Sequence, residues 1–290
     1  MENSKYEAFL LAAEYGSLTA AAQTLGYTQS GITRIIKGLE EDMGFALFVR
    51  TKNGVALTEN GKLLLPYFRD IAKSMQSVRQ LSADISGSIR GNISIGSCYS
   101  MAALWLPAVI KGFQSLHPGV TISLREDGSL GLARALAERT VDISFGPRQD
   151  VQGSDWTQLF EDEIVAWVPE GHPAAERGYM ELKDLEELPF IHTQPGQDTE
   201  IDRLLARLGI HPNVRFTTLN AFTTYNMVEA GLGVSLDQRL RSREWHGAVE
   251  ELSFRPVQKE AYGMALPSIR EVSPATRTFI DYVRSMQGNL

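Results

Sequence analysis

Apolar residues recur with helical spacing between positions 29 and 43 and give that stretch two unlike faces. Ile32, Ile36, Leu39 and Met43 are separated by four, three and four residues, which predicts a buried helical stripe. The opposite face has no acid before Glu40 and carries amide, hydroxyl and cationic side chains: Gln29, Ser30, Thr33, Arg34 and Lys37. Such groups suit base edges and phosphates in a major groove of DNA, although an ordinary surface helix is also polar on its wet side.

The residues on either side of this helix favour the DNA-binding interpretation. Thr28 stands at the N-cap position, so the free N–H groups and the positive end of the helix dipole would point outward. After the helix, the pattern predicts a strand over 45–50, a turn over 51–54 that ends in glycine, and a returning strand over 55–58. Arg50 and Lys52 would lie near the tip of this two-stranded wing, where they suit contacts to the DNA backbone or minor groove.

Two apolar stripes nearer the N-terminus predict two further helices. The first stripe consists of Tyr6, Phe9, Leu10 and Ala13, and the second of Ala20, Ala21 and Leu25. Gly26 follows the second stripe and permits a sharp reversal of the chain. Together these elements predict a winged helix-turn-helix DNA-binding domain at residues 1–58.

A long linker helix is predicted at residues 59–87, because the stretch from about 58 to 86 contains no proline except Pro66 near its start. Its apolar positions form a seam of heptads: Leu64, Phe68, Ile71, Met75, Val78, Leu81 and Ile85. A helix this long cannot bury the seam alone. Packing onto its own domain is one explanation, and we favour self-association, which suits a protein that binds a two-fold symmetric site.

Beyond the glycines at 87 and 91, short strands alternate with helices. The first unit has predicted strands at 92–97, 120–125 and 141–145 and helices at 101–116 and 129–138. A second unit repeats the scheme, with strands at 190–192, 214–217 and 234–236 and helices at 199–208 and 222–230. This alternation predicts a mostly parallel sheet with helices on both faces.

Two longer strands, near 163–168 and 261–266, are expected to link the two units, and a last helix at 274–286 returns to the first. The result is an α/β two-lobed, periplasmic-binding-protein-like domain at residues 88–290. Lobe I comprises about 91–161 and 268–290, and lobe II about 162–267. Two lobes joined by crossing strands form a hinged clamp for a ligand.

The chain closely resembles the LysR-type transcriptional regulators of bacteria over essentially its whole length. The motifs that carry the resemblance are GSLTAAA at 16–22, TQS at 28–30, LE at 39–40, LFVRT at 47–51 and LTENG at 57–61. One departure is Gly31 with Gly38, where the family more often has alanine or a polar residue. Each glycine costs about 1 kcal/mol of helix stability relative to alanine. Two explanations for these glycines stay open: they allow the helix to approach DNA closely, or the helix is slightly frayed.

The resemblance implies a regulator that binds an interrupted palindrome in double-stranded DNA as a homodimer or homotetramer. It also implies control by a small-molecule effector and contact with RNA polymerase. Base readout is expected from Gln29, Ser30, Thr33 and Arg34. The remaining DNA contacts are expected from Thr28, Lys37, Arg50 and Lys52.

Ligands of open α/β sheets bind at the carboxyl ends of strands, opposite helix N-termini. By local alignment, the resemblance implies effector contacts from Ser100, Ser129, Phe145, Gln197, Asn220 and Phe222, and the strand ends add Ser97 and Thr193. Helix capping is an equally good explanation for each hydroxyl. The lining favours a small anionic or polar effector with a ring or apolar body, and Arg148 is the cation expected nearest to it.

Composition limits the remaining possibilities. A chain of 290 residues that is 43% hydrophobic is large enough for two or three domains. No apolar stretch approaches 20 residues and the N-terminus is polar, so we expect a cytoplasmic protein without a membrane partner. The single cysteine, Cys98, excludes an intramolecular disulfide. It is predicted to be a small buried residue, because redox-sensing members of the family use paired cysteines.

Charge is unevenly distributed. Residues 1–90 hold ten Lys and Arg against nine Asp and Glu, a net +1, and residues 91–290 hold eighteen against twenty-six, a net −8. Four of the five cations in the first 60 residues are Arg34, Lys37, Arg50 and Lys52. A DNA-binding domain so weakly charged would depend on dimerisation and base readout.

No catalytic motif, metal-ligand spacing or dinucleotide fingerprint occurs, so we expect no enzyme activity, cofactor or metal. Gly231 and Gly233 lack the third glycine of a dinucleotide-binding loop and precede a strand. A solute-binding protein whose N-terminal helices only dimerise is the main alternative. An enzyme on a two-lobed scaffold is a third, and no residue supports it.

Overall fold

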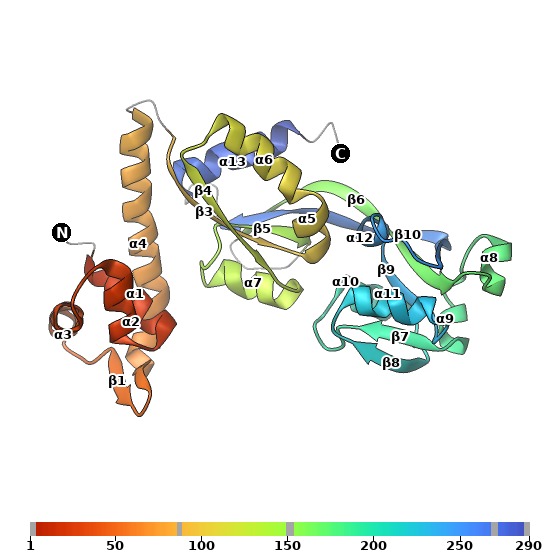
Figure 1. Ribbon diagram of the computed structural model, residues 1–290, viewed down its shortest axis with the longest axis horizontal. Helices are drawn as coiled ribbons and strands as arrows, with labels where there is room; N and C mark the ends of the chain where they lie inside the picture. The colour runs from red at the N-terminus through yellow and green to blue at the C-terminus, as the bar shows by residue number, and fades with distance from the viewer. Residues whose placement is uncertain (1–3, 86–88, 149–153, 268–271, 287–290) are drawn as a thin grey trace. The chain divides into compact units, whose positions relative to one another are not determined.

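The computed structural model describes residues 4–85, 89–148, 154–267 and 272–286 (Figure 1). The chain divides into two compact units, Met1–Gly91 with Ser273–Ala275 and Asn92–Val272 with Thr276–Leu290. Within the described ranges, each helix is too short or too polar to cross a bilayer.

The first unit begins with the predicted winged helix-turn-helix. Its elements are α1 (Ser4–Tyr15), α2 (Leu18–Leu25), α3 (Gln29–Met43), β1 (Phe48–Thr51) and β2 (Gly54–Leu57). The two strands pair antiparallel. The buried stripe of α3 is confirmed, because Ile32, Ile36 and Leu39 are fully or almost fully buried in the core of this unit.

Local capping explains where these helices begin and end. Gly26 adopts the left-handed conformation (φ 69°) that ends α2, and Thr28 caps α3 by accepting a 3.1 Å hydrogen bond from the Gly31 N–H. The first strand begins at Phe48, three residues later than predicted. The Glu40 carboxylate accepts hydrogen bonds from the N–H groups of Leu47 (2.7 Å) and Phe48 (3.1 Å) and so holds the preceding residues in a loop.

The linker helix α4 (Glu59–Ile85) divides the predicted seam into two parts. Leu64 and Phe68 pack into the core of the first unit, Phe68 against Phe9 with ring centroids 4.9 Å apart. Five large apolar side chains of the same helix remain exposed, and we call them the α4 stripe: Leu63, Tyr67, Ile71, Met75 and Val78. The side chains of Leu81 and Ile85, and the predicted break at 86–88, lie outside the described part of the chain.

The second unit is built on one six-stranded sheet of order β4-β3-β5-β10-β6-β9. Its strands are β3 (Gly91–Ser97), β4 (Val120–Glu126), β5 (Ile143–Pro147), β6 (Ser154–Pro169), β9 (Ser235–Gln238) and β10 (Val249–Pro267). The six-stranded sheet is mixed, because the predicted parallel arrangement applies to the alternating strands and not to the two linking strands β6 and β10. β3 and β5 are parallel, but β10 runs antiparallel to β5 and β6, and β6 antiparallel to β9. The reason is that the two long linking strands cross between the lobes in opposite directions.

Helices cover the sheet in both lobes (Figure 1). Lobe I has α5 (Tyr99–Leu104), α6 (Leu106–Leu116), α7 (Ser129–Ala137) and α13 (Pro274–Ser285). The single helix predicted over 101–116 is therefore two helices that meet at Trp105. Pro107 explains the break, because proline has no N–H for the hydrogen bond to the preceding turn and clashes with it.

Lobe II contains a small parallel sheet, β7 (Phe190–Thr193) and β8 (Val214–Thr218). Its helices are α8 (Pro173–Arg177), α9 (Asp184–Glu187), α10 (Glu200–Leu208), α11 (Ala221–Glu229) and α12 (Arg239–Ser242). The short helices α8, α9 and α12 were not predicted, because four or five residues are too few for a periodic stripe.

Strand β6 shows how lobe II is held together. Ile164, Ala166 and Val168 pack on one face, in the same cluster as Leu204 of α10. Val165 and Trp167 pack on the other face with α11. A strand buried on both faces fixes α10 and α11 on opposite sides of the sheet.

Candidate functional site

The polar face of α3 surrounds a shallow hollow on the first unit. The hollow is lined by Gln29, Ser30, Thr33, Arg34, Lys37, Gly38 and Glu41. All five residues predicted for this face are therefore brought together, and they are exposed or partly exposed.

The hydroxyl groups of this face are largely engaged within the helix. The Thr28 hydroxyl caps α3 and lies 3.1 Å from the Ser30 hydroxyl, and Thr33 donates a 2.8 Å hydrogen bond to the Gln29 carbonyl oxygen. Among the described residues, the side chains of Gln29 and Arg34 have no hydrogen-bond or ion-pair partner. An amide and a guanidinium left open on a helix face are the two groups best suited to bidentate contacts with bases.

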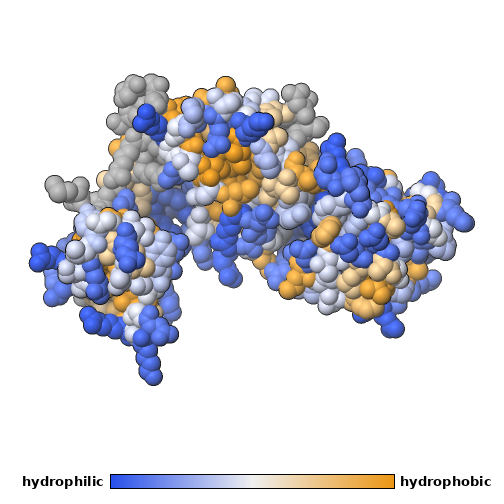
Figure 2. Space-filling model, viewed as in Figure 1, coloured by the Kyte–Doolittle hydropathy of each residue, from blue (hydrophilic) through white to orange (hydrophobic). Residues whose placement is uncertain are grey.

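Three further cations belong to the same surface. Lys37 forms only a long, exposed pair with Glu41 (3.9 Å), and such pairs are weak. Arg50 and Lys52 are exposed in the wing, whose tip is hydrophilic in Figure 2. The wing turn requires glycine, because Gly54 has φ 139° and a Cβ there would collide with the carbonyl oxygen of Gly16.

A second cavity, of about 320 Å³, opens between the two lobes of the second unit. Lobe I lines it with Cys98, Tyr99, Glu126, Asp127, Gly128 and Ser129, and lobe II with Gln194, Thr199, Glu200, Asn220 and Arg241. We call this cavity the cleft. Its volume suits a small molecule.

The eight predicted effector residues are not equally close to the cleft. Ser129 and Asn220 line it, and Ser100 is buried and donates a 2.6 Å hydrogen bond to the Gln238 side-chain oxygen. Thr193 lines a smaller adjoining recess and lies 2.7 Å from the Thr224 hydroxyl, Oγ1 to Oγ1. Ser97 is buried and donates to the Cys98 carbonyl oxygen at 3.0 Å.

The remaining three predicted effector residues do not line the cleft. Phe145 is completely buried in lobe I against Trp105 and Phe279, because it faces the helices that cover the sheet. Gln197 is exposed in the loop before α10. Phe222 is half-exposed, and its ring contacts Trp245 at 5.3 Å between centroids.

The cation of the cleft is Arg241, not the predicted Arg148. Arg148 lies over the Trp156 ring at 5.8 Å and does not line the cleft. Arg241 Nε is 3.0 Å from Asp237 Oδ1, and its Nη2 is 3.6 Å from Glu200 Oε1. Gln238 accepts from Ser100 and donates to Glu200, so a continuous polar chain runs from lobe I to lobe II.

Burial changes the acidity of two groups here. Desolvation raises the pKa of Asp237 to about 7, an effect that the Arg241 charge opposes only in part. Desolvation also raises the pKa of the Cys98 thiol. A thiol that holds its proton is a poor nucleophile, which agrees with the predicted structural role of Cys98.

Helix capping accounts for several of the polar groups. Asn220 caps α11 by accepting from the N–H groups of Phe222 (2.9 Å) and Thr223 (3.2 Å). Thr199 caps α10 in a reciprocal capping box with Asp202. Ser100 and Ser129 are not caps, so capping does not explain them.

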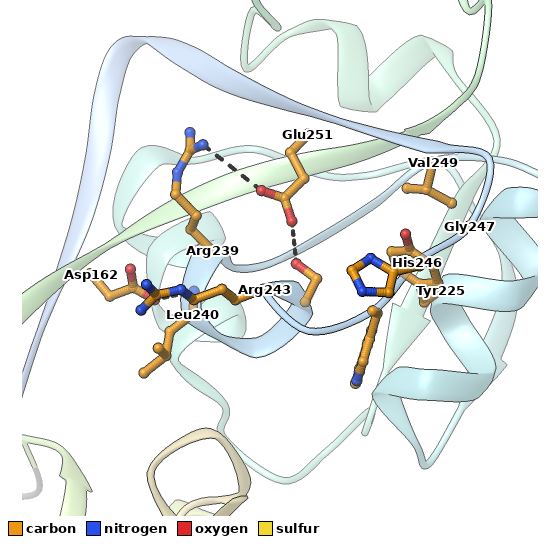
Figure 3. Close-up of a pocket in the computed structure, with 11 residues that line it drawn as sticks. Asp162, Tyr225, Arg239, Leu240, Arg243, His246, Gly247, Val249 and Glu251 are labelled. Atoms are coloured by element: carbon orange, nitrogen blue, oxygen red, sulfur yellow. Dashed lines mark hydrogen bonds and ion pairs between the residues drawn. The ribbon is translucent and has the colours of Figure 1, made fainter. Parts of the chain in front are cut away.

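A larger and more open hollow, of about 670 Å³, lies on lobe II (Figure 3). Its lining includes Arg239, Glu251, Tyr225 and His246. Arg239 pairs with Glu251 at 3.8 Å. No predicted effector residue lines it. The cleft, unlike this hollow, combines residues from both lobes. In the described residues no group of three or more His, Cys, Asp and Glu could hold a metal ion.

A winged helix-turn-helix joined to a two-lobed domain with a polar cleft defines a ligand-responsive DNA-binding regulator. Comparison with known families agrees. Residues 4–62 match the bacterial regulatory helix-turn-helix proteins of the lysR family, and residues 86–288 match the LysR substrate binding domain. The chain therefore belongs to the LysR family of DNA-binding transcriptional regulators, and it has an effector-binding domain rather than an enzyme domain.

Individual proteins are similar to this chain in sequence or in fold. An uncharacterized HTH-type transcriptional regulator of Bacillus subtilis, YvbU, is 26% identical over 99% of both chains. Full-length OxyR from Pseudomonas aeruginosa shares the fold, with a TM-score of 0.80 at 19% identity, over 98% of this chain and 95% of that one. The effector-binding domain of QuiR in complex with shikimate matches with a TM-score of 0.62 at 23% identity, over 69% of this chain and 99% of that one.

Proposed function

We propose that this protein binds an interrupted palindrome in double-stranded DNA and releases or remodels it when a small polar effector enters the cleft. The observation that carries the DNA part is the α3 face, where Gln29 and Arg34 are unpaired within the described chain. An exposed helix N-terminus beside these groups suits entry into a major groove. Arg34 and Gln29 read bases, with Ser30 and Thr33 beside them.

The phosphate contacts come from Thr28, Lys37, Arg50 and Lys52. Lys37 lies one turn beyond the base-reading residues, and the two wing cations lie outside the helix. Phosphate contacts of this kind position a protein on the duplex but carry no sequence information.

The α4 stripe supports the proposed homodimer. Its residues are spaced by four, four, four and three, so they share one helix face, and Leu63, Tyr67 and Val78 expose 69, 64 and 64% of their surface. An apolar face of this length on a soluble helix is best explained by a second copy of the helix. Two-fold pairing would give two recognition helices for two half-sites, and pairs of dimers would give the tetramer common in the family.

The effector is proposed to bind in the cleft. Of the two chemistries that the sequence left open, anionic and polar, we favour the polar one, because carboxylates outnumber cations in the lining. QuiR, whose effector-binding domain has the same fold, was solved in complex with shikimate, a small hydroxylated carboxylate, which supports a small-molecule effector without deciding its charge. Ser129 and Asn220 would contact it directly, and Ser100 through Gln238.

Effector binding would act on DNA through the angle between the lobes. The chain from Ser100 through Gln238 to Glu200 crosses between them, so a ligand that reorganises this chain changes how firmly the lobes are held. A ligand shifts such an equilibrium only by binding one arrangement more tightly than the other. Re-angled subunits would then alter DNA bending and, by analogy with the family, contact with RNA polymerase.

Footprinting on the DNA upstream of the protein's own gene tests this proposal. Wild type is compared with Arg34→Ala and with Lys62→Ala, a control that removes an exposed cation paired with Glu59 at 2.7 Å. We expect an interrupted palindrome to be protected by wild type and by Lys62→Ala, and protection to be lost in Arg34→Ala. Absence of protection by folded wild-type dimer at low salt would favour a solute-binding protein instead.

A further inference from the structure

The charges of the cleft determine which effectors it can accept. Three carboxylates line it, Glu126, Asp127 and Glu200, and one cation, Arg241. Asp237 borders the same region in the adjoining recess. Including Arg125, which pairs with Asp127 at 2.6 Å, the acids number four and the cations two.

The one cation of the lining is already occupied. The Arg241 guanidinium lies between Asp237 and Glu200, at 3.0 and 3.6 Å, and its side chain is only 11% exposed. An effector carboxylate that paired with Arg241 would have to displace one of two buried carboxylates and meet the negative charge of the other. Leaving a buried charge unpaired is costly.

Side chains of the protein itself also accept hydrogen bonds from N–H groups at the helix N-termini beside the cleft. At α7, the Asp127 carboxylate accepts a 2.9 Å hydrogen bond from the Gly128 N–H. At α11, Asn220 accepts from two N–H groups, and at α10 Thr199 accepts from the Asp202 N–H at 3.1 Å. At α10 and α11 the N–H groups that would ordinarily attract an anion therefore already have acceptors, and at α7 the Asp127 carboxylate places a negative charge beside the N-terminus.

Two groups in the lining remain open, and both suit a cation. Glu126 is exposed at the end of β4 and has no partner among the described residues. Tyr99 lines the cleft with 42% of its surface exposed, and aromatic rings attract ammonium and guanidinium groups. Glu200 adds a nine-tenths buried carboxylate on the opposite lobe.

We infer that the effector carries a positively charged nitrogen, an amine or guanidine, held by Glu126 and Tyr99 of lobe I, with Glu200 of lobe II adding negative charge while it keeps its contacts to Gln238 and Arg241. This inference rests on the proposed function, since it names the chemistry of the molecule that enters the cleft. A cation that joins acids of both lobes favours the closed arrangement, because each lobe alone supplies only part of its counter-charge.

Matched probes test the inference on the full-length protein. One series is 2-phenylethylamine, 2-phenylethanol and phenylacetate, and the other is 1,4-diaminobutane, 1,4-butanediol and succinate. Within each series the skeleton is similar and the end group is cationic, neutral or anionic. Affinity is measured from the rise in Tm with probe concentration.

At least one amine is expected to bind about tenfold more tightly than its alcohol and its acid. Glu126→Gln should reduce that preference to about twofold. Glu170→Gln, which removes an exposed carboxylate outside the cleft lining, should leave it unchanged.

An acid that binds as tightly as its amine, or no binding by either amine, would overturn the inference. So would a preference for the amine that survives in Glu126→Gln. Footprinting with the same preparation separates this failure from failure of the proposed function. Protected DNA together with a preference for acids contradicts only the cationic effector, whereas unprotected DNA contradicts the regulator itself.

Discussion

The α3 face and the cleft are both polar, but they hold their charges in opposite ways. On α3, Arg34 is exposed and without a partner in the described chain. In the cleft, Arg241 is nearly buried and lies between two carboxylates. A surface that meets a polyanion needs its cations open, whereas a pocket closed to water must pair its charges internally. We expect the first surface to bind DNA without rearrangement and the second to respond to an effector by exchanging partners.

The largest effect is expected from removing the cation of the cleft. Arg241→Ala leaves Asp237 and Glu200 buried without their counter-charge, which should lower the unfolding free energy of the second unit by about 3–5 kcal/mol. All four tryptophans lie in that unit, so tryptophan fluorescence in urea reports its unfolding. Arg243→Ala removes an exposed arginine nearby and should cost less than about 0.5 kcal/mol. Equal losses in the two variants would contradict a buried charge cluster.

The pH dependence of stability sharpens the same contrast. Asp237 keeps its proton up to about pH 7 in the folded protein but only to about 3.8 when unfolded. Between those values the folded state binds more protons, so the stability that this group contributes is present in acid and is lost as pH rises toward 7. Asp237→Asn removes this pH-dependent contribution to stability.

The difference in unfolding free energy between wild type and Asp237→Asn should therefore change by about 2–4 kcal/mol between pH 4 and pH 7.5. Urea unfolding at several pH values measures it. Asp198→Asn, which removes an exposed carboxylate paired with Arg203, serves as control. A difference independent of pH would show that Asp237 is charged throughout.

On the DNA side, the wing cations should act through phosphates alone. Lys52→Ala should weaken binding to all DNA sequences alike, and should reduce the slope of log affinity against log salt by about 0.9 for each phosphate that is no longer neutralised. Fluorescence anisotropy with specific and scrambled duplexes measures both quantities. Weakening confined to the specific duplex would instead assign Lys52 to base readout.

The smallest effect is expected at the two glycines of α3. A Cβ at Gly38 meets nothing within 4 Å, so Gly38→Ala should raise the stability of the first unit by about 0.5–1 kcal/mol. At Gly31 a Cβ would lie 3.2 Å from the Thr28 hydroxyl oxygen, so the same change should gain less. Thermal unfolding followed by circular dichroism compares them, and a loss of stability in Gly38→Ala would contradict the open space seen there.

The two regions also differ in how much of them the sequence reveals. The α3 face follows from one helical period, and all its predicted residues lie where that period puts them. The cleft is assembled from separate elements, and Ser100 and Gln238 are 138 residues apart. No local sequence pattern predicts a pairing over such a distance. For this reason the sequence did not identify Gln238, Glu200 and Arg241 as residues of the cleft region.

Strand-end reasoning was nevertheless informative in part. It led to Ser129 and Asn220, because loops at the carboxyl ends of strands do open into the cleft. It also named Phe145, whose side chain turns to the core, because a strand end does not fix which face a side chain takes. The antiparallel course of β10 was equally hidden, since a strand's direction depends on distant partners.

Footprinting of the upstream DNA with Arg34→Ala and Glu126→Gln side by side tests the central claim, that one surface reads DNA and a separate one reads the effector. We predict that Glu126→Gln protects the same interrupted palindrome as wild type, while Arg34→Ala protects none of it. Loss of protection in both variants, or in neither, would contradict the claim that the α3 face binds DNA and the cleft separately binds the effector.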